Sequence, residues 1–329
     1  MAEPLIALDE TPETRVLLAG WRRQWSDGGN ISSGMPRWLI DKLSARRIGG
    51  MTEEISRMCF PFQVAGTHDL YRPRAAFDDG LPSRPMQWDN GFWDAGDGVV
   101  IFLGVEPWYR IDLYGDAFFE AAAALGNPKI AAVEGYNGPA PPELERRVSC
   151  VYSKASMADE LRQHGMLFSS YGSQQRQGPT VGMALVSIAH YQHPDLEMVR
   201  VGAMAPMFPF SGGSSGSGGG GGGGQLGITT DHRAFYDIMR RLRALYSLDI
   251  DLSDLRPRYE EEASRLLESL DRVAQRNEEA RRYIDRVRND YQFQPFEEPV
   301  ELDPSIEGTL ADILGQFDLP DSEGETPDR

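Results

Sequence analysis

Two histidines near the middle of the chain have the spacing of a metal-binding pair. His190 and His193 stand three residues apart, a spacing that can bring two imidazoles to one ion on a single helix face. Pro194 follows directly and indicates a helix end at this place. No carboxylate or cysteine is placed to complete a ligand set. We therefore expect no metal and no cofactor, and we expect these histidines to carry charge at a helix C-terminus.

A cysteine and a histidine are the nearest approach to a nucleophile and its base. Cys150 and His164 would need a strained turn and a third, orienting group, and their sequence contexts supply neither. The chain has two cysteines, Cys59 and Cys150, which we expect to be buried thiols in a reducing compartment. The sequence thus favours a protein that is not an enzyme.

A polar segment after the first expected strand is the better candidate for ligand binding. Asp27-Gly28-Gly29-Asn30 separates a strand from a helix, where backbone N–H groups can bind an anion. Glu106 ends the clearest buried strand, and ligands of open α/β sheets lie at the carboxyl ends of strands. Asp27, Asn30 and Glu106 are therefore the candidate lining of a ligand crevice. The alternatives are a helix-capping turn and a buried carboxylate with satisfied hydrogen bonds, because the glycine fingerprint of a nucleotide site is incomplete.

Alternating strands and helices are expected to position these residues. Buried apolar runs predict strands, whereas a 3.6-residue apolar period between capping residues predicts helices. The strand–helix–strand spacing after residue 98 implies a βαβ unit with parallel pairing. We expect strands at 15–20, 54–64, 98–104, 130–135, 148–152 and 198–204, extended chain at 69–77, and helices at 112–125, 157–164, 181–190 and after Asp231.

Composition and charge narrow the function classes. The chain has 329 residues, of which 40% are hydrophobic, so it can bury a core in one large or two ordinary domains. Its net charge of −17 disfavours broad binding to nucleic acid or anionic membranes. No apolar run approaches the ~20 residues of a membrane span, and the N-terminal pattern is not that of a signal peptide. We expect a cytoplasmic protein that binds neither nucleic acid nor membranes.

The most regular pattern lies near the C-terminus. Ten residues from Tyr259 to Tyr291 recur at alternating steps of four and three, which keeps one seam on one side of a helix. We therefore expect an α/β core at 1–254 and one long heptad-patterned helix at 255–294. Asn277, within the seam, either sets the register of an oligomer or faces solvent in an intramolecular helical hairpin. The candidate contacts to a partner or second subunit are Leu266, Leu270, Val273, Asn277, Ile284 and Val287.

Two further segments differ in composition from the core. Residues 211–224 are a Ser/Gly run that predicts a flexible loop, whether as a natural insertion or an engineered replacement. Residues 295–329 hold eleven acidic residues and one Arg, and so carry ten of the seventeen net negative charges. Within this acidic tail a short amphipathic helix either docks into a groove of a partner or folds back on its own domain. Its apolar residues are Ile306, Leu310, Ile313, Leu314 and Phe317.

Several short motifs occur in a shared order along the chain. They are Leu17-Leu18-Ala19-Gly20-Trp21 with Trp25-Ser26-Asp27-Gly28-Gly29-Asn30, Phe102-Leu103-Gly104-Val105-Glu106-Pro107, Tyr171-Gly172 with Gly178-Pro179-Thr180-Val181-Gly182, and Ala205-Pro206-Met207-Phe208. Together with the helices from Asp231 to Tyr291, they resemble the proteasome assembly chaperone 2 family. The resemblance covers roughly Val16 to Tyr291, and Val181 stands where the family usually has a glycine.

The resemblance implies both a fold and a function. The implied fold is a three-layer α/β sandwich with a mixed, mostly parallel sheet, as in the phosphorylase/hydrolase group, and a long C-terminal helix. The family has no known catalytic site, forms oligomers and, in some members, binds proteasome α-subunits. Some archaeal members dock through a C-terminal hydrophobic–Tyr–any-residue motif, from which Pro327-Asp328-Arg329 departs.

The leading hypothesis is therefore a non-enzymatic homo-oligomer that acts through protein contacts and resembles proteasome assembly chaperones. The alternative is a small-molecule or nucleoside binder, or an enzyme, that uses the crevice at the strand ends.

Overall fold

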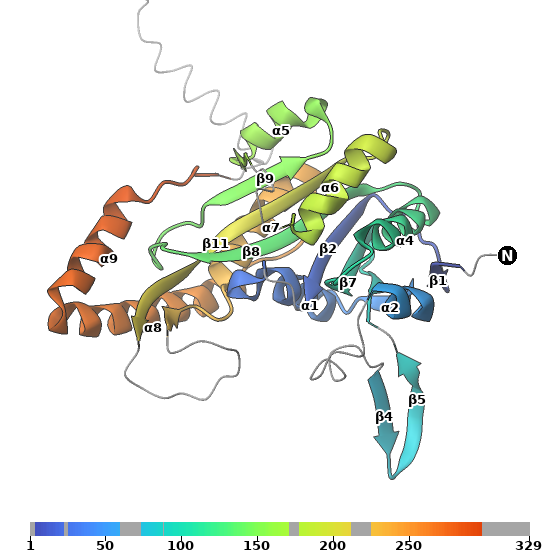
Figure 1. Cartoon of the computed structure of the whole chain (residues 1–329), viewed down its shortest axis with the longest axis horizontal. Helices are drawn as coiled ribbons and strands as arrows, with labels where there is room; N and C mark the ends of the chain where they lie inside the picture. The colour runs from blue at the N-terminus through green and yellow to red at the C-terminus, as the bar shows by residue number, and fades with distance from the viewer. Residues whose placement is uncertain are drawn as a thin grey trace, which may run out of the picture. The chain divides into compact units, whose positions relative to one another are not determined.

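A single large sheet organises the chain. The computed structural model describes residues 4–22, 26–59, 74–87, 89–170, 178–211 and 225–297. Its strands are β1 Ile6–Leu8, β2 Val16–Arg22, β3 Arg46–Met51, β4 Arg74–Asp78, β5 Leu81–Gln87, β6 Gly91–Asp94, β7 Val99–Val105, β8 Lys129–Gly138, β9 Val148–Tyr152, β10 Leu167–Phe168, β11 Met198–Ser211 and β12 Gln225–Gly227. In the described part, ten of them form one sheet in the order β1-β3-β6-β7-β2-β8-β11-β9-β10, with β12 paired to β11 (Figure 1).

The centre of this sheet is parallel and its flanks are antiparallel. Strands β7, β2, β8 and β11 pair in parallel, whereas β6 and β9 run antiparallel to their inner neighbours. The predicted strand–helix–strand unit is β7–α4–β8, in which α4 spans Ile111–Ala124. Because β2 pairs with both β7 and β8, it lies between the two strands of that unit.

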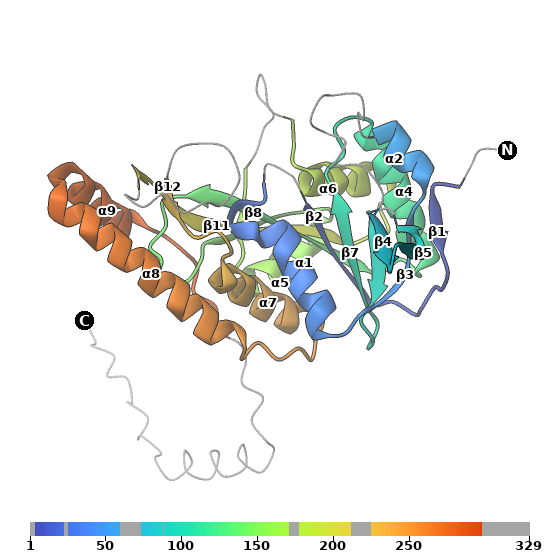
Figure 2. The ribbon, with the colours of Figure 1, turned by 90° about the horizontal axis from the view of Figure 1, so that it is seen from below.

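Helices cover both faces of the sheet. They are α1 Ile31–Lys42, α2 Glu53–Cys59, α5 Ala158–Gln163, α6 Val181–Gln192, α7 His232–Tyr246, α8 Leu255–Arg276 and α9 Glu278–Asp290, besides α4. Along β2, Val16 and Leu18 join one buried cluster with α1 and α7, while Leu17 and Trp21 join another with α4 and α6. Figure 2 shows these two pairs of helices on opposite sides of the sheet. The predicted fold class, a three-layer α/β sandwich around a mixed, mostly parallel sheet, is confirmed.

One expected strand is wrong. The strand expected at 54–64 is instead helix α2 as far as Cys59, and the strand lies earlier, at β3. A Cβ at Gly49 would lie 2.2 Å from the carbonyl oxygen of Ala7, so the close approach of β1 requires glycine there. The glycines that β3 needs make the strand look like a turn in the sequence.

A β-hairpin outside the large sheet was not expected. Strands β4 and β5 form a two-stranded sheet of their own, so part of the stretch expected to be extended is one leg of this hairpin. Asp79 and Gly80 join the strands with φ values of 45° and 80°, and two positive φ angles in succession are those of a type I′ turn. The Asp-Gly pair was the sequence signal for this hairpin.

By its internal contacts the chain divides into two units, Met1–Phe296 and Glu297–Arg329, and the sheet with its helices belongs to the first. The Ser/Gly loop at 212–224 lies outside the described residues. So do the tail residues Ile306, Leu310, Ile313, Leu314 and Phe317, whose docking therefore stays a prediction. None of the described helices is both long and apolar enough to cross a membrane.

Candidate functional site

The heptad segment forms two helices, so the prediction of one continuous helix is wrong. Helix α8 ends at Arg276, and Asn277 adopts an extended conformation with φ −142° and ψ 110°. The Asn277 side chain accepts hydrogen bonds from Glu279 N at 2.9 Å and Ala280 N at 3.2 Å, which makes it the N-cap of α9. Asn277 therefore starts a second helix. Glu278 and Glu279 in its first turn stabilise this helix through their interaction with the positive end of the helix dipole.

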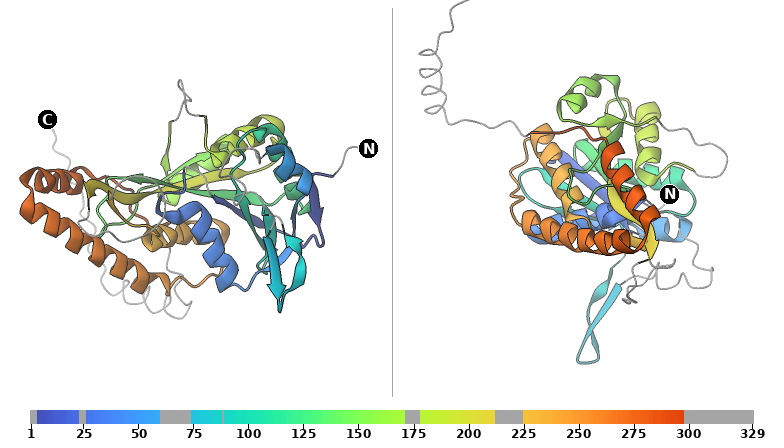
Figure 3. Two further views of the ribbon diagram at one scale, coloured as in Figure 1. Left: turned by 60° about the horizontal axis from the view of Figure 1, so that its bottom comes forward. Right: turned by 90° about the vertical axis from the view of Figure 1, so that its left-hand side faces the viewer.

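The apolar seam of α8 and α9 packs on the end of the sheet formed by the last residues of β11 and by β12 (Figure 3). Leu266, Leu270 and Ile284 are buried together with Phe208 of β11 and Ile228, which follows β12. Both helices thus point their heptad residues at one small core inside their own chain. Of the other predicted contacts, Val273 and Val287 are half-buried and Asn277 is exposed. Contact of all six residues with another subunit stays a prediction, but three of them are already used within the chain.

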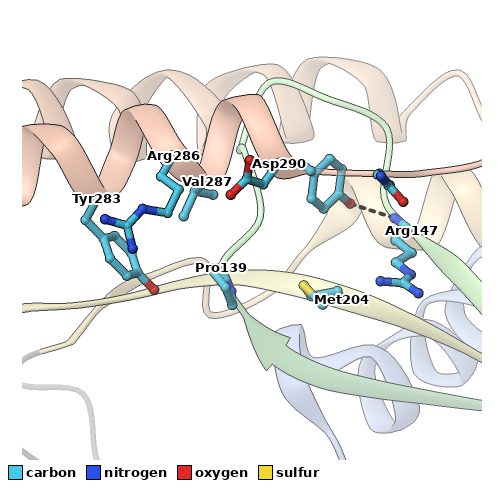
Figure 4. Close-up of a pocket in the computed structure, with 9 residues that line it drawn as sticks. Pro139, Arg147, Met204, Tyr283, Arg286, Val287 and Asp290 are labelled. Atoms are coloured by element: carbon cyan, nitrogen blue, oxygen red, sulfur yellow. Dashed lines mark hydrogen bonds between the residues drawn. The ribbon is translucent and has the colours of Figure 1, made fainter.

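A cavity of about 310 Å³ lies between α9 and the ends of the central strands. Tyr283, Arg286, Val287 and Asp290 line it from α9. Pro139, Arg147 and Met204 line it from the sheet side, where Met204 belongs to β11 (Figure 4). The walls therefore combine apolar side chains with two guanidinium groups and one carboxylate.

A tyrosine at the end of α9 closes one side of this cavity. The Tyr291 hydroxyl accepts a hydrogen bond from Arg147 N at 2.7 Å and donates one to Glu145 O at 3.2 Å. Burial raises the pKa of Tyr291 to about 12, and the hydrogen bond from Arg147 opposes the shift, so the phenol is neutral at physiological pH. Tyr291 fastens the end of α9 to the segment that leads into β9.

A buried ion pair holds that segment in place. The Arg146 guanidinium donates to both carboxylate oxygens of Asp231, at 2.8 and 3.2 Å, and both side chains are within 1% of full burial. Its remaining N–H groups donate to backbone carbonyls that include Pro141 O at 3.0 Å and Leu144 O at 2.8 Å. Asp231 also accepts from Ala234 N and thereby caps α7, as predicted. Sequence reasoning missed Arg146, because its partner lies 85 positions away and the neighbouring Arg147 is exposed.

This arrangement suits recognition of a protein segment better than catalysis. An apolar recess beside two guanidinium groups can hold an apolar side chain of a partner whose neighbouring carboxylate pairs with arginine. Arg147 and Arg286 are exposed, so their charges are accessible to such a partner.

The loop before α1 has a structural role in this fold. The Asp27 carboxylate accepts hydrogen bonds from Ser33 N at 3.0 Å and Ser33 Oγ at 2.6 Å, so it fills the anion position at the N-terminus of α1 itself. A Cβ at Gly28 would lie 2.5 Å from the backbone of Tyr136, and one at Gly29 would lie 2.6 Å from Ala205 Cβ. These two glycines allow close packing of the loop on the sheet.

Asp27 and Asn30 lie in the segment between β2 and α1, whereas Glu106 directly follows β7. Asp27 forms a bridge to Gly135 of β8, and the Asn30 side chain lies beside the Ser33 hydroxyl that donates to Asp27. On the other side of β2, Glu106 N donates to Arg22 O at 3.1 Å. A ligand role for Asp27, Asn30 and Glu106 stays a prediction, while the hydrogen bond from Ser33 N to Asp27 favours the capping alternative.

Asp27 is expected to make stability depend on pH. Burial raises the pKa of Asp27 from 3.8 to about 6, against the hydrogen bonds from Ser33. The folded state therefore binds this proton more tightly than the unfolded state, and the stability that it contributes is lost as pH rises between about 4 and about 6. We expect Asp27→Asn to become more stable relative to the unchanged chain as pH rises through this window, as measured by urea unfolding. A difference in unfolding free energy that stays constant over this range would contradict the expectation.

A buried carboxylate explains the Gly-Pro-Thr motif. Glu134 of β8 accepts hydrogen bonds from Arg200 Nε at 2.5 Å, Thr180 Oγ1 at 2.6 Å and Gly182 N at 2.8 Å. Thr180 in turn caps α6 by accepting from Met183 N at 3.2 Å. A Cβ at Gly182 would lie 2.8 Å from the Arg200 side chain, so glycine lets the helix approach the sheet. The motif therefore anchors α6 on the sheet through buried charges.

The other residues with potential chemistry are separated. His190 Nδ1 hydrogen-bonds Ser153 O at 2.7 Å, whereas the ring of His193 stacks on Phe119 with centroids 4.4 Å apart. Burial raises the pKa values of Cys59 and Cys150 to about 12, which leaves both thiols protonated. Within the described ranges there is no group of three or more His, Cys, Asp or Glu residues that could hold a metal ion.

Comparison with known proteins identifies the family. The model of the PAC2 family matches residues 23–270, which is about three quarters of the chain. The chain belongs to the PAC2 family. No curated protein matches it.

Solved structures share the PAC2 fold. A proteasome-assembly chaperone homologue from Mycobacterium tuberculosis is 18% identical, with a TM-score of 0.57 over 77% of this chain and 94% of that one. A PAC2 family protein from Streptomyces avermitilis is 18% identical, with a TM-score of 0.56 over 82% and 99%. PbaB of Pyrococcus furiosus, an archaeal proteasome activator, is 12% identical, with a TM-score of 0.53 over 80% and 97%. At these identities the likeness shows the fold alone.

Proposed function

We propose that this PAC2 protein is an oligomeric, non-enzymatic binding protein whose partners are related to the proteasome. The match to the PAC2 family over residues 23–270 carries the proposal. Support comes from solved PAC2-like structures described as a proteasome-assembly chaperone homologue and an archaeal proteasome activator. The partner surface that we propose is the cavity between α9 and the sheet side, with Arg147 and Arg286 in its lining.

The chemistry of that cavity defines the expected partner segment. Arg147 and Arg286 favour a carboxylate, and Tyr283, Val287 and Met204 favour an apolar side chain next to it. Arginine and tyrosine are also the residue types that most often dominate binding energy in protein interfaces. The partner segment is therefore an acidic, partly apolar stretch on a proteasome α-subunit.

Capture of proteasome α-subunits by the full-length chain tests this function. We expect the unchanged chain to retain α-subunits and Arg286→Glu to reduce the affinity by about tenfold or more, equivalent to at least about 1.4 kcal/mol. Arg282→Glu is the matched control, because it makes the same charge reversal on α9 at an exposed residue outside the cavity lining. No capture by the unchanged chain would contradict the function, and equal effects of the two variants would contradict the cavity.

The acidic tail is tested in the same assay. Deleting residues 298–329 removes the tail and keeps Phe296, which is buried in the body. If the tail docks on the α-subunit, capture falls in the deletion variant. If the cavity is the principal contact, capture stays and remains sensitive to Arg286→Glu.

A further inference from the structure

Exposed apolar side chains are concentrated in one part of this molecule. Among the described residues, eight large hydrophobic side chains are exposed, and seven of them lie between Met58 and Ile111. They are Met58, Phe77, Leu81, Met86, Trp108, Tyr109 and Ile111. Scattered single hydrophobic residues are normal on a protein surface, whereas a concentration of this kind marks an interaction site. Trp, Tyr, Phe and Met are also enriched in the cores of interfaces.

The first half of this surface is the β4–β5 hairpin, residues 74–87, which we call the arm. Phe77, Leu81 and Met86 are 66%, 72% and 66% exposed. Figures 1 and 3 show the arm standing clear of the other described strands and helices. An isolated two-stranded hairpin is marginally stable at best in water and needs an apolar surface to pack on. The body of its own chain leaves these side chains exposed.

The second half is a patch on the body, which we call the root patch: Met58, Trp108, Tyr109 and Ile111. Trp108 and Tyr109 are 53% and 49% exposed, and Met58 and Ile111 are about a third exposed. A hydrogen bond of 3.0 Å from Trp108 N to Cys59 O joins the loop after β7 to the end of α2, so the four residues belong to adjoining elements. This bond fixes the backbone that carries the aromatic residues, which lowers the entropy cost of ordering the loop on binding.

We propose that the arm of one copy of this chain packs on the root patch of a second copy, and reciprocally. Both complementary halves are present in every copy, and a two-fold exchange covers both through one self-complementary interface. Each of the seven side chains exposes on the order of 100 Å². Together they therefore offer roughly 700 Å² of surface per copy that the interface can bury. A standard interface buries about 800 Å² per partner, so the area suffices for a stable dimer.

The net charge of the arm does not oppose a second copy. The chain carries −17, so two copies repel each other in general, but the arm has two Arg and two Asp and is neutral. Contact through the arm therefore adds no net charge of its own to this repulsion. Because salt screens the remaining repulsion, we expect self-association to strengthen with ionic strength.

Sedimentation equilibrium of the full-length chain over a range of concentrations tests the exchange. The unchanged chain is expected to self-associate, and the arm variant Phe77→Ser/Leu81→Ser and the root variant Tyr109→Ser/Ile111→Ser are each expected to weaken association at least about tenfold. Tyr191→Ser is the matched control, because Tyr191 is the eighth exposed large hydrophobic residue of the described ranges and belongs to α6, which is part of neither the arm nor the root patch. Circular dichroism and thermal unfolding verify that each variant is folded, as expected for changes at exposed side chains.

Mixing the two variants separates arm-to-root exchange from other modes of self-association. The root variant keeps an intact arm and the arm variant keeps an intact root patch, so a tagged arm variant should capture the root variant better than either captures itself. Recovery of the mixed complex supports reciprocal exchange, and its absence overturns it.

The inference rests on the oligomeric part of the proposed function, and the experiment distinguishes the two. A chain that is monomeric at every concentration overturns both oligomerisation and exchange. Self-association that the arm and root variants leave unchanged overturns only the exchange. Proteasome binding is judged separately, by the capture assay with Arg286→Glu.

Discussion

Arg146→Leu is expected to lower the free energy of unfolding by about 3–5 kcal/mol, because it leaves the Asp231 carboxylate buried without its counter-charge. Arg146 and Asp231 are almost fully buried, and the guanidinium also satisfies backbone carbonyls of residues 141–144. Urea unfolding followed by circular dichroism measures the change. The same variant should weaken partner capture, because the segment that carries Arg147 loses its anchor.

Two further variants give this prediction its controls. Arg256→Leu breaks an exposed pair with Glu260 and should change stability by less than about 1 kcal/mol. Arg146→Leu/Asp231→Ser removes both charges and keeps a residue that can cap α7, so part of the lost stability should return. If Arg146→Leu costs no more than Arg256→Leu, the buried pair does not hold this segment.

Leu270→Ala is expected to cost about 2–5 kcal/mol and to leave the mass in solution unchanged. Leu270 is 1% exposed and packs with Leu266, Ile284 and Phe208, so its truncation opens a cavity inside the small core under α8 and α9. Leu267→Ala, three residues earlier in the helix at a half-buried position, should cost less. Denaturant unfolding and light scattering measure the two quantities.

The opposite outcome would indicate that the heptad residues lie in a subunit interface. If Leu270→Ala keeps the stability of the unchanged chain and lowers its mass in solution, the seam contacts another copy. The two measurements together are decisive. A side chain buried within its own chain affects stability without changing the mass in solution, whereas a side chain in a subunit interface affects the mass.

Elements with strong local patterns were predicted well. The apolar run that became β7 and the helix that became α4 agree with the structure to within one or two residues. Asp231 was also recognised as a helix cap. These features depend on neighbours in the sequence, so periodicity and capping residues are sufficient to predict them.

Elements that depend on distant contacts were missed. Strand β3 needs Gly49 because the backbone of the paired strand β1 comes very close to it, and no local sequence pattern indicates this close approach. The continuous heptad seam concealed the break at Asn277, because two consecutive helices can share the same apolar stripe as one long helix. The buried pairs Arg146–Asp231 and Arg200–Glu134 join residues 85 and 66 positions apart.

The sequence by itself determined the family, the three-layer α/β fold class and the segments with an apolar stripe. Those properties follow from local periodicity and from motifs whose residue types are visible in the chain. Only the tertiary structure decided that the heptad residues Leu266, Leu270 and Ile284 pack inside the chain, that Asp27 fills its own anion position, and that the arm and root patch stay exposed. The physical reason is that burial is a property of pairs of surfaces, and the sequence specifies each surface without specifying which one covers it.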